Sequence, residues 1–167
     1  MTDAIRFRLA EEKDAALVFR FVRALAEYEN LSDQVTATEA DIREHVFQKQ
    51  RAQALIGEVE GKAIGFALFF FNYSTFVGRP GLYVEDLFVY PKYRGRGYGK
   101  AFFQEMAKIA REKKCGRMEW SCLDWNQPSI DFYRALGAVP MEEWTVFRLT
   151  EDGFGRLAEE KASWVQE

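Results

Sequence analysis

The sequence predicts a mixed α/β fold in a single domain over residues 1–167. The chain is 48 % hydrophobic and 16 % aromatic, which is enough to fill one sizeable core. Segments with strand and helix periodicity alternate in the order β-α-α-β-β-β-α-β-α-β, without repeats, linkers or low-complexity stretches. A glycine-rich turn separates a buried strand from a basic amphipathic helix, as expected of an α/β ligand site.

Hydrophobic periodicity and turn residues define the individual elements. The elements expected in the first half are a strand at 5–9, a helix from 13 to 28, a short helix at 39–48 opened by the capping pair Thr38 and Asp41, and strands at 53–59 and 63–73. The elements expected in the second half are a strand at 82–89, the helix after the glycine turn, a strand at 117–122, a helix from Pro128 to Gly137, a strand at Trp144–Leu149 and a helical tail from Glu151.

Composition and charge exclude several classes of protein. A net charge of −3 gives no reason to expect nucleic acid as a partner. No apolar run approaches the ~20 residues that cross a bilayer, and the N-terminus lacks a signal-peptide pattern, so we expect a soluble cytoplasmic protein. Cys115 and Cys122 are too few for a disulfide framework, and no metal site is expected.

Charge is unevenly distributed along the chain. Residues 27–44 hold six acidic and one basic residue, whereas residues 92–117 hold nine basic and two acidic residues. One region would therefore attract cations and the other polyanions.

The glycine turn is the most specific feature of the sequence. Gly95, Gly97 and Gly99 alternate with Arg96 and Tyr98 directly before a helix. Glycine adopts backbone conformations closed to other residues, and the first helical N–H groups have no intrahelical partner. Together they predict a cradle for the pyrophosphate of a coenzyme.

Two better-known phosphate motifs do not fit this turn. A Walker A loop would need Ser or Thr where Ala101 stands and glycine where Arg94 stands. The dinucleotide pattern Gly-x-Gly-x-x-Gly fails because Lys100 occupies its last position. The remaining match is to the pattern Arg/Gln-x-x-Gly-x-Gly/Ala.

The segment Arg94–Gly99 resembles the coenzyme A signature of the GNAT acetyltransferases. Further stretches resemble the spermidine/spermine (diamine) N-acetyltransferase branch of that family, and together they extend over about residues 5 to 150; they are Leu25–Glu29, Gln34–Glu39, Gly65–Ala67, Leu82–Val89 and Trp125–Tyr133. The resemblance implies a GNAT fold, in which helices flank a central, mostly antiparallel sheet whose splayed strand pair binds acetyl-CoA.

The resemblance also implies which residues bind acetyl-CoA. Strand residues would meet the pantetheine arm through their backbone, the turn would hold the pyrophosphate, and the start of the next helix would line the coenzyme. The residues concerned are Leu87, Phe88 and Val89 in the strand; Arg94, Gly95, Arg96, Gly97, Tyr98, Gly99 and Lys100 in the turn; and Asn126, Ser129 and Tyr133 beside and in the helix.

Acetyl transfer to an amine requires that a proton be removed, because a free alkylamine has a pKa of about 10. Glu85 and Asp86 interrupt an apolar strand, and adjacent strand residues face opposite sides, so at least one carboxylate faces a cleft or interior. By resemblance Glu85 contacts the amine and serves in proton removal, directly or through water. Tyr133 would donate a proton to the departing thiolate.

By resemblance the acceptor is a primary amine of a small polyamine or diamine, such as spermidine or spermine, attacked directly in a ternary complex. The expected substrate-side residues are Tyr28, Glu29, Glu85, Asp86, Glu143 and Trp144. Thialysine or another lysine-like amino acid is an alternative acceptor. A non-catalytic acyl-CoA-binding regulator is an alternative of another class. The resemblance further implies a homodimer, and no nucleic acid or membrane partner.

Overall fold

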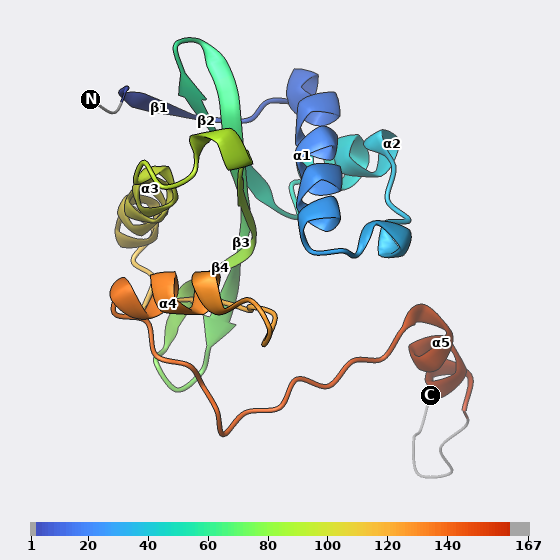
Figure 1. Ribbon diagram of the computed structural model, residues 1–167. Coiled ribbons are helices and arrows are strands. Elements are labelled where there is room, and N and C mark those ends of the chain that lie inside the picture. The colour runs from blue at the N-terminus through green and yellow to red at the C-terminus, as the bar shows by residue number, and fades with distance from the viewer. Residues whose placement is uncertain (1–2, 161–167) are drawn as a thin grey trace. The chain divides into compact units, whose positions relative to one another are not determined.

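The computed structural model describes residues 3–160 (Figure 1). These residues form two compact units, the first ending at Asn126 and the second beginning at Gln127. The first unit contains a β-sheet with its helices. The second contains two short helices joined by an irregular segment.

The sheet of the first unit has five strands in sequence order within the described residues. They are β1 (Ile5–Leu9), β2 (Gln53–Val59), β3 (Lys62–Ser74), β4 (Arg79–Val89) and β5 (Arg117–Trp120). Neighbours from β1 to β4 pair antiparallel, while β5 runs parallel to β4 because a helical crossover connects them. The five strands confirm the prediction for this part of the chain, although β4 begins earlier and β5 ends earlier than expected.

The principal helices of the first unit lie on opposite sides of the sheet, α1 on one side and α3 on the other (Figure 1). The helical segments are η1 (Glu12–Asp14), α1 (Ala15–Tyr28), η2 (Ser32–Gln34), α2 (Glu39–Asp41), the π-helix η3 (Ile42–Gln48), η4 (Pro91–Tyr93) and α3 (Tyr98–Glu112). The predicted capping pair of α2 is confirmed, because Thr38 N–H donates to Asp41 Oδ2 at 2.8 Å and Asp41 N–H donates to Thr38 Oγ1 at 3.2 Å. Among residues 3–160 no helix combines the length and apolar character needed to span a bilayer.

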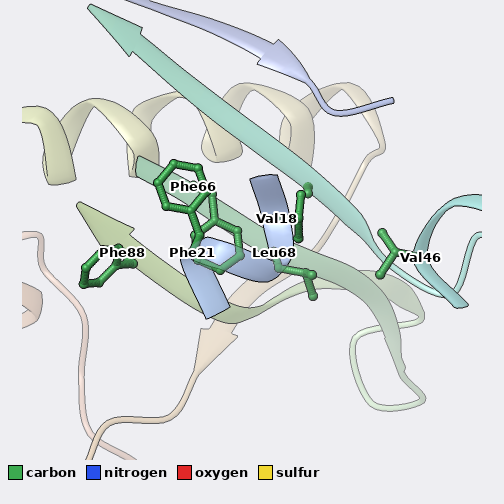
Figure 2. Close-up of a cluster of buried hydrophobic side chains, with 7 residues drawn as sticks. Val18, Phe21, Val46, Phe66, Leu68 and Phe88 are labelled. Carbon is green, nitrogen blue, oxygen red and sulfur yellow. The ribbon is translucent and has the colours of Figure 1, made fainter. Parts of the chain in front are cut away.

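An aromatic and aliphatic cluster joins α1 to the middle of the sheet (Figure 2). Val18 and Phe21 of α1 lie one turn apart on the same helix face, and both are fully buried. The ring of Phe21 stacks on Phe66 of β3 with centroids 5.2 Å apart. Phe88 of β4 belongs to the same cluster.

The second unit contains α4 (Gln127–Ala135) and α5 (Glu151–Glu159), which confirms the two predicted helices over these residues. The last part of the predicted helical tail, residues 161–167, lies outside the described residues. The predicted strand Trp144–Leu149 is wrong: it pairs with no strand within residues 3–160, and its side chains are exposed, Phe147 at 92 %. An apolar run becomes a strand only where a neighbouring strand accepts its main-chain hydrogen bonds.

Gly65 in β3 tests how closely β3 and β4 pack. A Cβ at this position would lie 2.4 Å from the carbonyl oxygen of Phe88, an atom of the backbone that cannot swing aside. We expect Gly65→Ala to lower the free energy of unfolding by about 1 to 3 kcal/mol, the usual cost of overpacking. Urea unfolding measures this.

Gly155→Ala is the matched control, because a Cβ there meets nothing within 4 Å and alanine favours the helix. Gly155→Ala should leave the free energy of unfolding unchanged or raise it slightly. Equal effects of the two substitutions would contradict the close approach of β3 and β4.

Candidate functional site

The predicted coenzyme strand has an open edge. The pairing of β4 with β5 ends at Val84 and Trp120, while β4 continues to Val89. No strand among the described residues pairs with this edge beyond Val84. The two parallel strands therefore diverge, as the splayed pair in the prediction requires.

Main-chain alternation decides which groups of β4 face this open edge. Tyr90 N–H donates to Ile64 O of β3 at 3.0 Å, so the backbone polar groups of Phe88, two residues earlier, also face β3. Those of Leu87 and Val89 consequently face the opening. Of the three predicted backbone contacts to the coenzyme, Leu87 and Val89 are the better placed, and the side chain of Phe88 belongs to the core.

The glycine turn has the backbone conformation expected of an anion cradle. Gly95 and Gly97 have φ of 73° and 84°, in the left-handed region that favours glycine. α3 starts directly afterwards, and its first helical hydrogen bond runs from Ala101 N–H to Gly97 O. The N–H groups of the preceding helical residues, Tyr98 to Lys100, thus precede the intrahelical ladder, as at an anion-binding helix N-terminus.

The side chains of this turn differ in their surroundings. Arg96 and Lys100 are exposed and supply positive charge beside the helix N-terminus. Tyr98 is 3 % exposed, and its hydroxyl donates to Asp3 O at 3.0 Å, so it anchors the helix in the fold. Only its backbone remains available to the cradle.

Arg94 is engaged within the protein. Its main-chain N–H donates to Pro91 O at 3.1 Å, and its Nε–H donates to Val89 O at 2.8 Å, on the open edge of β4. Its guanidinium lies over the ring of Tyr28, with Cζ 4.1 Å from the centroid. Arg94 thereby joins the turn to the end of α1.

A β-bulge separates the roles of Glu85 and Asp86. Leu68 of β3 faces Asp86 and Phe69 faces Val84, so Glu85 is the extra residue of β4. Glu85 is exposed, whereas Asp86 is half-buried. Burial raises the pKa of Asp86 to about 7, with further contributions from the charges of Glu85 and Glu29.

Glu29, at the end of α1, belongs to the same electrostatic cluster. Burial raises the pKa of its carboxyl. Burial likewise raises the pKa of the Cys122 thiol, and the charges of Glu29 and Asp124 add to this. A thiol held neutral is a poor nucleophile, which argues against a covalent role for Cys122. The carboxylates of α1 and β4 therefore form a region that favours a positively charged ligand.

The remaining predicted residues lie at the end of the first unit and in the second. Asn126 is 5 % exposed. Ser129 and Tyr133 are four residues apart on α4, so they share one helix face, and both are half-buried. Glu143 and Trp144 are exposed in the irregular segment. No cluster of three or more metal-ligating side chains occurs among residues 3–160.

Two features of the site were missed at the level of sequence. One is the contact between Arg94 and Tyr28, which are far apart in the chain. The other is the difference between Asp86 and Glu85, which depends on the bulge. A polar pair within an apolar strand is a signal for a bulge, but it does not reveal which residue is the extra one.

The chain belongs to the GNAT acetyltransferase family. The model of that family, described as "Acetyltransferase (GNAT) family", matches residues 20–138. The protein is accordingly an N-acetyltransferase of the family that uses acetyl-CoA, and the mixed α/β GNAT fold expected from the resemblance is confirmed.

Named relatives match over most of the chain. Thialysine N-epsilon-acetyltransferase of Bos taurus is 37 % identical over 166 residues, covering 92 % of this chain and 97 % of that protein. Spermidine/spermine N(1)-acetyltransferase-like protein 1 of Homo sapiens is 32 % identical over 161 residues, covering 90 % of this chain and 23 % of that protein.

Solved structures agree with the fold. An integron cassette protein from the mobile metagenome of V. cholerae has a TM-score of 0.78 at 24 % identity, over 96 % of this chain and 99 % of that one. At this identity the similarity concerns the fold alone.

The raised pKa of Asp86 makes stability depend on pH. Between its ordinary value below 4 and about 7, the folded state holds one more proton than the unfolded state, so stability falls as pH rises through this window. Asp86→Asn removes this effect, and we expect it to raise the free energy of unfolding at pH 8 by roughly 2 to 4 kcal/mol, since one pKa unit corresponds to about 1.4 kcal/mol. Urea unfolding at pH 4 and pH 8 checks this.

Glu85→Gln provides the comparison, because it removes the adjacent but exposed carboxylate. At pH 8, Glu85→Gln should raise the free energy of unfolding much less than Asp86→Asn does. A similar gain for both variants, or the same gain at pH 4 as at pH 8, would contradict the burial of Asp86.

Proposed function

We propose that this enzyme transfers the acetyl group of acetyl-CoA to a primary amine of a small diamine or polyamine, such as spermidine or spermine. The observation that carries the proposal is the cluster of Glu29, Glu85 and Asp86 beside the open edge of β4. Burial disfavours the ionised form of Asp86, and a bound cation would favour it, so the cluster favours an acceptor with more than one positive charge.

The coenzyme side is supported by the backbone of the first unit. The main-chain groups of Leu87 and the N–H of Val89 face an edge where an extended pantetheine arm can add like a strand, whereas Val89 O accepts from Arg94. The glycine turn and the exposed Arg96 and Lys100 suit the pyrophosphate. When bound, acetyl-CoA supplies the acetyl group as a thioester and a thiolate as leaving group.

Proton transfer completes the proposed chemistry. Glu85, exposed at the bulge, accepts the proton of the acceptor ammonium, directly or through water, so that the neutral nitrogen forms the bond to the carbonyl carbon. Tyr133 donates its hydroxyl proton to the sulfur as the carbon–sulfur bond breaks, and the second proton that the nitrogen loses as the amide forms returns to the tyrosinate, directly or through water. Asp86 and Glu29, with Tyr28, hold the remaining positive charge of the acceptor, and Glu143 and Trp144 are further proposed contacts.

Thialysine, or another lysine-like amino acid, is the second candidate acceptor. The observation that favours it is the 37 % identity to a protein named thialysine N-epsilon-acetyltransferase over 92 % of this chain. Such an acceptor also carries a primary amine and a second amino group, but its carboxylate would meet the acidic cluster unfavourably.

We further propose that residues 1–167 act as one acetyltransferase domain, within a homodimer. The apolar side chains exposed in the second unit support an association, because large exposed apolar patches mark protein contacts. They include Trp144 at 75 %, Val146 at 80 %, Phe147 at 92 % and Leu149 at 61 %.

A thiol-release assay tests the proposed acceptor. With acetyl-CoA and a panel of spermidine, spermine, diaminopropane, thialysine and lysine, we expect the highest kcat/KM for a diamine or polyamine. A preference for thialysine would support the second candidate instead. Tight coenzyme binding without turnover of any amine would contradict both and favour a non-catalytic acyl-CoA-binding regulator.

Tyr133→Phe tests the proposed acid. Loss of the hydroxyl should lower kcat at least about tenfold, because general acid catalysis contributes typically about a hundredfold or more. The affinity for coenzyme, measured by calorimetry, should change little. Tyr73→Phe removes a hydroxyl from an exposed tyrosine of β3 and should leave kcat unchanged. Equal activity of both variants would exclude Tyr133 as the acid.

A further inference from the structure

The Arg94 side chain connects three parts of the site. Arg94 itself belongs to the glycine turn, its Nε–H donates to Val89 O at 2.8 Å on the open edge of β4, and its guanidinium covers the ring of Tyr28 at the end of α1. The guanidinium carbon also lies 5.4 Å from the centroid of the Phe88 ring, which is part of the buried cluster.

These contacts limit what Arg94 can offer to a phosphate. Its main-chain N–H is bonded to Pro91 O, its Nε–H is bonded to Val89 O, and one face of the guanidinium lies against Tyr28. Arg94 and Arg96 are both exposed on this turn, but the guanidinium of Arg96 lies near the ring of Tyr93 in η4, with Cζ 5.9 Å from the centroid, and not over α1. The turn therefore contains two arginines with different surroundings, although its sequence suggests one shared role.

The stacking of Arg94 on Tyr28 also affects Glu29, because the two residues are adjacent at the end of α1. Tyr28 is the last residue of α1, and Glu29 follows it as the C-terminal cap. Glu29 contributes to the raised pKa of Asp86, so its carboxylate lies within electrostatic reach of the bulge. A side chain that holds Tyr28 in place also holds Glu29 relative to Asp86.

We propose that Arg94 is a positioning residue for the acceptor side of the site, holding Tyr28 and Glu29 against the coenzyme turn. This inference rests on the proposed function. It assigns to the Arg94 side chain a role in amine binding that the phosphate motif alone does not suggest. Cation–π contacts are favourable both at exposed sites and, more strongly, where partly desolvated.

Arg94→Met tests this role, because methionine keeps an apolar stem but removes the charge and the donors. We expect the KM for the preferred amine to rise about fivefold to tenfold, the effect of roughly one stacking and hydrogen-bonding contact. The dissociation constant for coenzyme A, measured by calorimetry, should stay within about twofold. Arg96→Met, from the same turn, should show the reverse pattern.

A double-mutant cycle identifies the partner of Arg94. Tyr28→Leu removes the ring, and Arg94→Met in that background should add little to the KM of the amine. Tyr28→Phe keeps the ring, so in that background Arg94→Met should still raise the KM of the amine. Arg94→Lys keeps the charge over the ring and should restore part of the lost affinity for the amine.

The outcomes separate this inference from the proposed function. If Arg94→Met weakens coenzyme binding as much as Arg96→Met and leaves the KM of the amine unchanged, the role of Arg94 in amine binding is overturned. The proposed acetyltransferase function is not affected by that result. Additive effects of Arg94→Met and Tyr28→Leu would also overturn it. Failure of the wild-type protein to acetylate any amine would instead overturn the proposed function, and the inference with it.

Discussion

The divergence of β5 from β4 after Val84 is the constraint on which the site depends. A sheet edge inside a fold leaves main-chain donors and acceptors without a strand partner, and such groups need another partner. At Val89 the protein supplies one itself, through Arg94. At Leu87 the groups face the opening where the coenzyme arm is proposed to lie. The divergence of β4 and β5 therefore exposes main-chain groups that can bind a ligand, and this requires only ordinary strand geometry.

The burial of Asp86 follows from the same region of β4. The bulge places two consecutive carboxylates in different environments, one exposed and one half-buried. Burying a carboxylate without a cation is unfavourable, and the raised pKa of Asp86 is the consequence. A cationic acceptor would relieve this cost, so the folded protein carries a local destabilisation that its proposed substrate removes.

The buried core of the first unit holds the site residues of α1 and β4 in place. Phe21, Phe66 and Phe88 join α1, β3 and β4 in one cluster (Figure 2). This packing fixes α1 against the strands that contain the bulge. Gly65 admits the close approach of β4 that this cluster requires. Glu29 and Asp86 owe their proximity to packing between apolar residues that take no part in the chemistry.

The sequence by itself determined most elements of the fold and the backbone conformation of the glycine turn, because these depend on local periodicity and on the conformational freedom of Gly95 and Gly97. It did not determine the fate of Trp144–Leu149, since strand formation requires a partner elsewhere in space. Only the tertiary structure decided that Asp86 is the more buried carboxylate and that Arg94 lies on Tyr28. Both depend on strand register and on packing between segments distant in the chain, and neither is encoded in the spacing of neighbouring residues.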